Sequence, residues 1–264
     1  MSGPNGLPGS RDIHITDCVF DRNYRQGMSV IGVANTLVER TVLANTNGTA
    51  PSAGVDIEPY LPTFEVTNVS FIDCRASNNS GPGFAFYISH FNETTAPFGM
   101  LLSNFAIDSG DSFGISIDYI APGVRGSMTV VNSSVKNTRF SPLAIIDKAA
   151  PDSFVTIRGC SFGAESAVAN RVNNWTSPIS VIADKGCHSS LGWRATGGVQ
   201  FEDVTVHDTR NRPWLHSEVR PGLGLINVTG TGLRVFNPNG CTQSGPLELT
   251  AKCEKMPAVK LKQQ

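Results

Sequence analysis

The stretch Gly54-Val-Asp-Ile-Glu58 places apolar residues at its second and fourth positions and acidic residues at its third and fifth. This period of two is typical of a β-strand with one buried face. The pattern recurs, each time opening with Gly or Pro, at residues 27–31, 83–87, 114–118, 142–146 and 178–182, with 222–226 as a closing member. Successive openings lie 27, 29, 31, 28 and 36 residues apart. Repetition at this period predicts a solenoid with one such strand in every coil.

A second family of segments alternates with the first and keeps two apolar residues five positions apart. Its members are residues 15–20, 38–43, 66–71, 102–107, 130–135, 157–162 and 201–206. Their third positions hold Asp17, Asn68, Asn104, Asn132, Gly159 and Asp203, with Arg40 as the exception. Asp, Asn and Gly tolerate the left-handed backbone that a sharp corner requires. Each segment is therefore expected to carry the chain around a corner of the coil.

Two strand patterns that alternate in fixed order predict an all-β fold, a right-handed parallel β-helix of about six to eight coils. An antiparallel sandwich is the rival fold, but it explains this alternation poorly. The inward pairs would be Met28/Val30, Val55/Ile57, Phe84/Phe86, Ile115/Ile117, Leu143/Ile145 and Ile179/Val181. The β-helix domain is expected over residues 1–240, without an N-terminal cap, followed by an irregular C-terminal tail over 241–264.

Composition and charge narrow the classes of protein. Charged residues make up 16% of the 264 residues, while 26 Gly and 16 Pro favour turns over long surface helices. The formal net charge of −1 argues against a general binder of nucleic acid. No apolar run approaches the roughly 18 residues of a membrane span. The oligomeric state leaves no signal in the sequence.

The cysteines and sequons bear on the compartment. Six cysteines show no CxxC pair and no zinc spacing, so no structural metal site is expected. Cys241 and Cys253, with Cys187, suggest a terminal disulfide, whereas Cys18 and Cys160 fit buried free thiols better. Seven N-x-[ST] sequons begin at Asn47, Asn68, Asn78, Asn92, Asn132, Asn174 and Asn227. They favour a secreted or extracellular glycoprotein, although turn chemistry alone would also explain them and no signal peptide is present.

Three motifs between residues 23 and 59 carry a family resemblance: Asn23-Tyr-Arg-Gln-Gly27, Asn45-Thr-Asn-Gly-Thr-Ala-Pro51 and Gly54-Val-Asp-Ile-Glu-Pro59. They resemble the right-handed parallel β-helix repeat proteins of the pectin-lyase-like superfamily, and the general repeat extends from about residue 12 to 236. The resemblance implies carbohydrate chemistry as the commonest activity, by polysaccharide lyases, glycoside hydrolases or uronate epimerases. The superfamily also contains binding and structural proteins, so the fold alone decides little. The paired-Asp signatures of polygalacturonases are missing.

Outward residues of the first strand family form the candidate site. Because Val55 and Ile57 face the core, Asp56 and Glu58 face outward on one strand. Stacking then places Glu58, Tyr87 and Asp118 along one face, with Glu58 and Asp118 about 10 Å apart. We expect Asp56, Glu58 and Asp118 to be catalytic, with Tyr87, Arg25 and His90 in substrate binding. The simpler alternative is a solvated sheet face, on which such residues have no chemical role.

Further residues complete the predicted groove. Ile31, Ile146 and Ile182 would support a sugar face, and loops 45–53 and 92–99 would form the walls. Trp193, Trp214, His188, His207 and His216 lie in a less regular segment, for which a cap over the end of the solenoid is the favoured interpretation. Residues 255–264 are expected to be a disordered tail.

Paired carboxylates suit glycoside hydrolysis, with one protonated as general acid and the other ionised. Three carboxylates on one face would also suit Ca²⁺, the one cofactor suggested here. A lyase would need a basic residue beside the acids, and Arg22 and Arg25 are displaced in register from them. Hydrolysis of glycosidic bonds in an extended polysaccharide is therefore favoured over a lyase or epimerase. The alternative of another class is a non-catalytic extracellular β-helix that binds glycans or acts as a scaffold.

Overall fold

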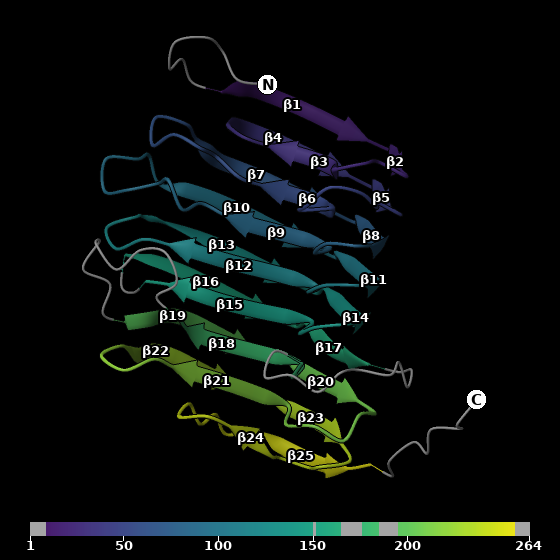
Figure 1. The fold of residues 1–264 in the computed structure, drawn as a ribbon, viewed down its shortest axis with the longest axis vertical. Coiled ribbons are helices and arrows are strands. Elements are labelled where there is room, and N and C mark those ends of the chain that lie inside the picture. The colour runs from purple at the N-terminus through teal and green to yellow at the C-terminus, as the bar shows by residue number, and fades with distance from the viewer. Residues whose placement is uncertain (1–8, 150–151, 165–175, 185–194, 257–264) are drawn as a thin grey trace.

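A computed structural model of the 264-residue chain describes residues 9–149, 152–164, 176–184 and 195–256. The described residues form only strands and turns, which wind into stacked coils with a parallel sheet along each of three sides (Figure 1). The predicted parallel β-helix is confirmed, and the rival antiparallel sandwich is excluded because every paired strand runs parallel to its neighbour. No helix in the described part of the chain could cross a bilayer.

The three sheets, which we call A, B and C, are given in stacking order. Sheet A contains β1 (Ser10–Thr16), β4 (Val33–Glu39), β7 (Val66–Ile72), β10 (Phe98–Ser103), β13 (Gly126–Val131), β16 (Ser153–Arg158), β19 (Ala195–Glu202) and β22 (Gly224–Thr231). Sheet B contains β2 (Val19–Asp21), β5 (Val42–Ala44), β8 (Arg75–Asn79), β11 (Ala106–Gly110), β14 (Ser134–Thr138), β17 (Ser161–Ala164), β20 (Thr205–Asp208), β23 (Arg234–Asn237) and β25 (Lys252–Lys255). Sheet C contains β3 (Gln26–Val30), β6 (Ala53–Ile57), β9 (Phe84–Tyr87), β12 (Ile115–Ile120), β15 (Leu143–Lys148), β18 (Ile179–Ala183), β21 (Leu215–Val219) and β24 (Gln243–Ser244).

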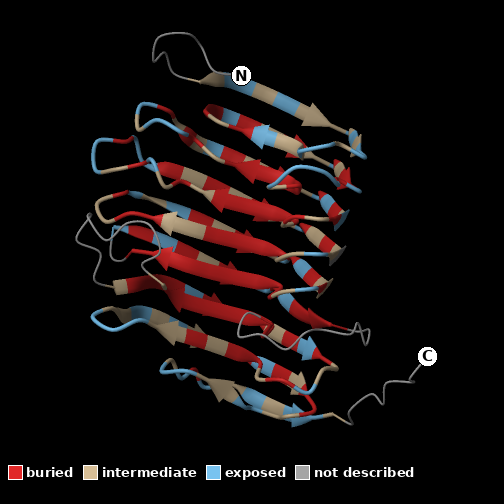
Figure 2. Cartoon of the chain, viewed as in Figure 1, coloured by how far each residue is buried: buried red, intermediate tan, exposed pale blue. Residues whose placement is uncertain are grey.

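The core runs along the solenoid axis and is most fully buried in the middle coils (Figure 2). Sheet C contributes the predicted inward columns, in which Val55, Phe84, Ile115, Leu143 and Ile179 pair in register from coil to coil. All five are at most 1% exposed. Because side chains of a strand alternate between its faces, burial of this column turns the residues between its members outward.

Glycine opens four of the sheet C segments because the next coil leaves no room for a side chain. A Cβ added at Gly54 would lie 2.6 Å from the carbonyl oxygen of Gly83 one coil further, and also close to the side chain of Asn79. This close approach of backbones explains the Gly column that the sequence repeats.

The corner between sheets A and B follows the second repeat, with one error in the predicted register. Phe71, at the end of β7, pairs with Val38 and Leu102, so the corner of that coil spans Phe71 to Ala76 and turns at Asp73. The predicted segment 66–71 instead lies within β7, and its Asn68 stacks on Asn35 through a 3.0 Å hydrogen bond. Asn68 and Asp73 both adopt left-handed backbone in this coil, and the sequence spacing selected Asn68 in place of the true corner residue Asp73.

The corner positions share one backbone conformation whatever their residue type. Their φ angles are +53° at Asp17, +45° at Arg40, +55° at Asp73, +51° at Asn104, +51° at Asn132, +63° at Gly159 and +51° at Asp203. Arg40 therefore adopts the same corner as the Asp, Asn and Gly residues. Side chains stabilise the stack, since the Asn104 amide donates to Asp73 over 2.9 Å and Arg40 Nε donates to Asp17 over 2.8 Å.

Two predictions for the C-terminal region are wrong. The seventh strand of sheet C is β21, whose Leu215 pairs with Ile179, whereas residues 222–226 lead into β22 of sheet A. The segment after residue 240 is not wholly irregular, because β24 and β25 extend sheets C and B. Trp214, which is 1% exposed, occupies the position before the sheet C strand that Gly or Pro holds in earlier coils.

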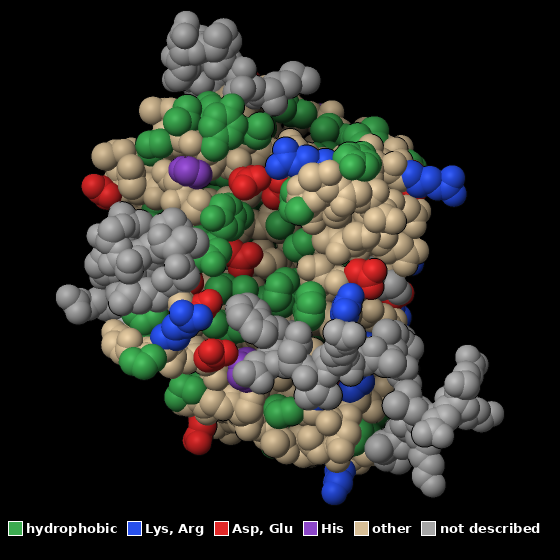
Figure 3. Space-filling view, viewed as in Figure 1, with side chains coloured by type: hydrophobic (Ala, Val, Ile, Leu, Met, Phe, Trp, Pro, Cys, Tyr) green, Lys and Arg blue, Asp and Glu red, His purple; other side chains and the backbone are tan. Residues whose placement is uncertain are grey.

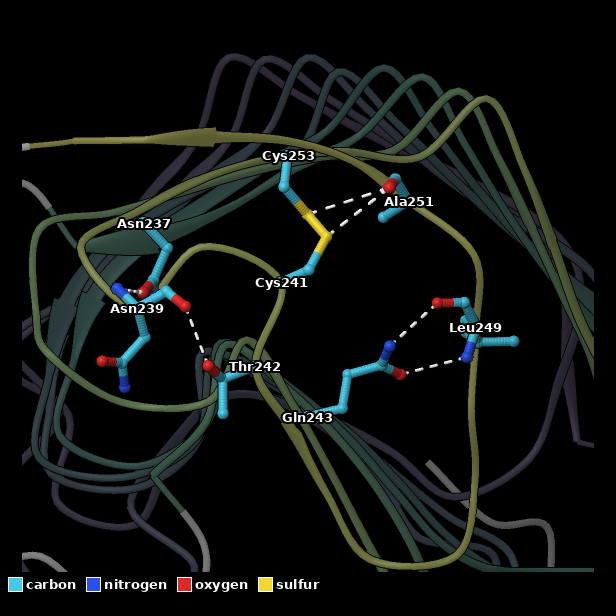
Figure 4. The surroundings of a disulfide bond; sticks show 8 residues. All are labelled: Asn237, Asn239, Cys241, Thr242, Gln243, Leu249, Ala251 and Cys253. Carbon is cyan, nitrogen blue, oxygen red and sulfur yellow. Dashed lines mark hydrogen bonds between the residues drawn. A yellow bond between two sulfur atoms is a disulfide. The ribbon is translucent and has the colours of Figure 1, made fainter.

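The predicted terminal disulfide is present between Cys241 and Cys253 (Figure 4). Beside it, the Gln243 side chain donates to the carbonyl of Leu249 over 2.9 Å and accepts from its amide over 3.0 Å. Cys160 is a buried free thiol as predicted, and Cys18 is half-buried. Cys187, His188, Trp193, Asn174 and residues 257–264 lie outside the described residues.

Candidate functional site

A groove of about 360 Å³ runs over the outer face of sheet C. Its lining residues come from three successive coils and the loops before their strands: Arg25, Ala50, Pro51, Asp56, Glu58, Pro82, Ala85, Tyr87 and Asp118. In the space-filling view, acidic side chains gather in the hollow at the centre of this face (Figure 3). Five of the six predicted site residues therefore share one groove, and the sixth, His90, is exposed beyond its lining.

In-register stacking brings these residues together. Asp56 pairs with Ser29 on one side and Ala85 on the other, and Ala85 pairs with Ser116. In the next outward column Asp118 pairs with Tyr87 and with Ile146. Glu58 follows the end of β6, and its amide donates to the Val30 carbonyl over 3.0 Å, which continues the register. The predicted placement of Tyr87 and Asp118 in one outward column is confirmed by their strand pairing.

Asp118 is the most perturbed acid of the groove. Its Oδ1 atom is buried without a hydrogen bond, while Oδ2 accepts a 2.5 Å hydrogen bond from the Ser116 hydroxyl. Desolvation raises the pKa of Asp118 to about 7; the Ser116 hydrogen bond lowers it, and the negative charge of Asp147 raises it further. A carboxyl group with such a pKa holds a proton near neutrality, as a general acid must.

Asp56 and Glu58 form an acidic pair two coils before Asp118. Asp56 is 3% exposed, and its Oδ2 accepts a 2.9 Å hydrogen bond from the Gln26 side chain. Desolvation raises the pKa of Asp56, against the Gln26 hydrogen bond and the charge of Arg25, which lower it. Desolvation and the charge of Asp56 raise the pKa of Glu58, while Arg25 and His90 lower it. The two acids thus influence each other through a partly dry groove.

Arg25, which was predicted to take part in substrate binding, lies in the groove wall. It precedes β3, and its Nε donates to the Ala50 carbonyl over 3.3 Å, which fixes the guanidinium beside the loop before β6. Its long side chain spans the displacement in register that the sequence indicated. Loop 45–53 contributes Ala50 and Pro51 to the wall as predicted, whereas no residue of loop 92–99 lines the groove.

Tyr87, which lines the groove, contacts a second aromatic ring. The Tyr87 and Tyr119 rings meet edge to face with their centroids 5.2 Å apart. Tyr119 has a φ of +55°, which displaces it from the plain alternation of β12. The sequence pattern could not reveal this left-handed position within the strand, and Tyr119 was missed for that reason.

The predicted apolar platform is absent at Ile146 and Ile182, and two residues of the site were not predicted. Ile146 and Ile182 do not offer a platform, because they are 7% and 0% exposed and pack with Ala144 and Phe113 into a second apolar cluster. Gln26 and Ser116, the hydrogen-bond partners of Asp56 and Asp118, carried no recognisable motif. Within the described part of the chain, no three His, Cys, Asp or Glu side chains lie close enough together to hold a metal ion.

Comparison with protein families gives a match over residues 6–185 to the model described as right handed beta helix region. The chain belongs to this family. The right-handed coil direction that parallel crossovers favour accords with the match. Comparisons with curated proteins and with solved structures give no match. The family describes a fold, so the function has to be argued from the groove.

Proposed function

We propose that this β-helix protein is a carbohydrate-active enzyme that hydrolyses glycosidic bonds of an extended polysaccharide in the groove of sheet C. The observation that carries the proposal is Asp118, an acid with a pKa of about 7 that lies on the same wall as Tyr87 and the Asp56/Glu58 pair. Glycoside hydrolysis requires one protonated and one ionised carboxyl group, roles that we assign to Asp118 and Glu58. An open groove also suits a long chain better than a closed pocket would.

In the proposed mechanism, Asp118 donates its proton to the oxygen of the scissile bond. Glu58, two strands away, takes a proton from the water that attacks the anomeric carbon from the opposite side, and the charge of Asp56 makes Glu58 a stronger base. Two strand spacings separate the Glu58 and Asp118 backbones by about 10 Å. Inverting enzymes hold their carboxyl groups about 6.5–9.5 Å apart, and retaining enzymes about 5–5.5 Å. A backbone separation of about 10 Å is nearer to the inverting range than to the retaining one, so inversion is the outcome that we propose.

Arg25 favours a second candidate, a polysaccharide lyase or uronate epimerase. Such an enzyme needs a base beside its acids, and the Arg25 guanidinium lies in the wall next to Asp56 and Glu58. Arginine is a weak candidate for that base, since a guanidinium group keeps its proton in almost every protein environment. The two reactions differ in product, because elimination leaves an unsaturated sugar and hydrolysis adds water.

A panel of polysaccharides, assayed with and without Ca²⁺ for new reducing ends and for unsaturated products, tests these functions. Asp118→Asn should lower turnover by about 10²- to 10⁴-fold and leave the affinity nearly unchanged. The matched control is Asp111→Asn, which removes an exposed acid outside the groove lining. A wild-type protein that binds a glycan of the panel and cleaves none would instead be a non-catalytic glycan-binding module.

We also propose an extracellular location. The Cys241–Cys253 disulfide supports it, because disulfides persist in oxidising compartments. The sequons support it less than their number suggests, because four of their asparagines adopt left-handed backbone: Asn68, Asn78, Asn132 and Asn227, with φ of +51° to +53°. The tolerance of Asn for this conformation accounts for those four. Secretion of the full-length protein with the disulfide formed is the corresponding test.

A further inference from the structure

The charges of the groove are unbalanced. Its lining contains three carboxyl groups, on Asp56, Glu58 and Asp118, and one guanidinium, on Arg25. Arg25 already donates Nε to the Ala50 carbonyl, and Asp56 receives a neutral amide from Gln26. The groove therefore presents more negative than positive charge to whatever enters it.

Asp118 is the acid with the least compensation. Its hydrogen-bond partner is a neutral hydroxyl, its buried Oδ1 has no partner, and the charged group that acts on it is a further acid, Asp147. Arg25 and His90 act on Glu58 at the other end of the wall. Burial of a carboxylate without a counter-charge is unfavourable, so Asp118 holds its proton, and the negative charge that a cation can meet lies on Asp56 and Glu58.

We propose that the groove binds a glycan carrying free amino groups, a polymer of unsubstituted amino sugars, whose ammonium groups face Asp56 and Glu58, while Asp118 keeps its proton. This inference rests on the proposed function for the class of ligand and adds the chemistry of its sugar. A ring with a protonated amine offers both a face for Tyr87 and a charge for the acids. A polyuronate brings a carboxylate on every sugar, and like charges close together in a partly dry groove cost binding free energy.

The spacing of the acids suits a repeating cationic chain better than one compact ion. Asp56 and Glu58 lie two residues apart on one strand, about 6.5–7 Å between Cα atoms, and Asp118 lies two strands further. A bound Ca²⁺ instead gathers oxygen ligands within about 2.6 Å of one centre. Ligand charges that recur along a polymer match acids that recur along a wall.

Calorimetry with three hexasaccharides of equal length tests the inference: fully deacetylated glucosamine, its fully N-acetylated counterpart and an oligogalacturonate. At mildly acidic pH the wild-type protein should bind the free-amine hexamer at least tenfold more tightly than the N-acetylated one. Binding should release protons, seen as a dependence of the heat on the buffer, because a nearby cation lowers the pKa of Asp56 and Glu58, which burial raises. Glu58→Gln should reduce that release.

Glu58→Gln and Glu248→Gln form the matched pair of variants. Each substitution replaces one Glu by Gln and so removes one carboxyl group. Glu58 lies in the groove, whereas Glu248 is an exposed acid outside the groove lining. Only Glu58→Gln should weaken the preference for the free-amine hexamer. Equal binding of the N-acetylated hexamer, tighter binding of the galacturonate, or an equal effect of both variants would overturn the inference.

Product analysis of the same mixtures separates this inference from the proposed hydrolysis. Preferred binding of the free-amine hexamer without cleavage would support the amino-sugar inference while removing the hydrolase function. Cleavage confined to an uncharged or uronate glycan would support hydrolysis while overturning the amino-sugar inference.

Discussion

Asp118 owes its chemistry to its neighbours rather than to its sequence context. Ser116, two positions earlier, donates a hydrogen bond to it, and Tyr87 pairs with it on the strand one coil earlier. The negative charge of Asp147 raises its pKa further. The period-two pattern could predict that Asp118 faces outward. It could not predict the desolvation of Asp118, because that depends on loops whose paths the pattern does not describe.

Asp118→Asn should stabilise the fold at alkaline pH even as it removes turnover. The folded-state pKa of about 7 lies above the ordinary 3.8, so the folded state binds the extra proton. Stability from that proton is fully present below about pH 4 and is lost as pH rises through 7. At pH 8 the variant should gain about 2–4 kcal/mol over wild type, and near pH 4 almost nothing. Urea unfolding at both pH values checks this, and a pH-independent difference would contradict it.

The strands and corners of the coils are the features that the sequence predicted best. The inward columns of sheet C were read correctly because apolar alternation leaves little freedom of register. Errors came where two elements share a composition. Asn68 and Asp73 both adopt left-handed backbone in one coil, and the spacing rule chose the wrong one. Trp214 replaced the expected Gly or Pro, so the last full strand of sheet C was missed.

Gly54→Ala should destabilise the protein by about 1–3 kcal/mol, because its Cβ would meet the Gly83 carbonyl and the backbones would have to separate. Pro178→Ala is the control, since this equivalent position of a later coil already holds a side chain. Its effect should stay below about 1 kcal/mol. Chemical denaturation measures both, and equal losses would show that the Gly column has no special role.

At the scale of the whole molecule, each coil contacts chiefly the coils on either side of it, so stability is close to a sum over neighbours. Acids far apart in sequence become neighbours for the same reason, and this is how one wall can carry Glu58 and Asp118. The family match covers residues 6–185 and so includes every coil that contributes to the groove.

Loss of the Cys241–Cys253 disulfide should loosen the last coil and leave the groove intact. The bridge joins residues 12 apart, and loops of that size are worth about 3 kcal/mol in chain-entropy terms. In a Cys241→Ser/Cys253→Ser variant, hydrogen exchange should quicken in β24 and β25 and stay unchanged in β6, β9 and β12. Faster exchange across all coils would mean that the molecule unfolds as one unit.

The most direct test of the central claim is the titration of Asp118 itself, followed by carboxyl ¹³C NMR and assigned through Asp118→Asn. The claim is that stacked coils desolvate the carboxyl group of this half-buried acid in the wall of an acidic groove, where it acts as a proton donor. We predict a midpoint near pH 7 for Asp118. A midpoint near the ordinary 3.8 would place the carboxyl group in water and contradict both the geometry of the site and the proposed reaction.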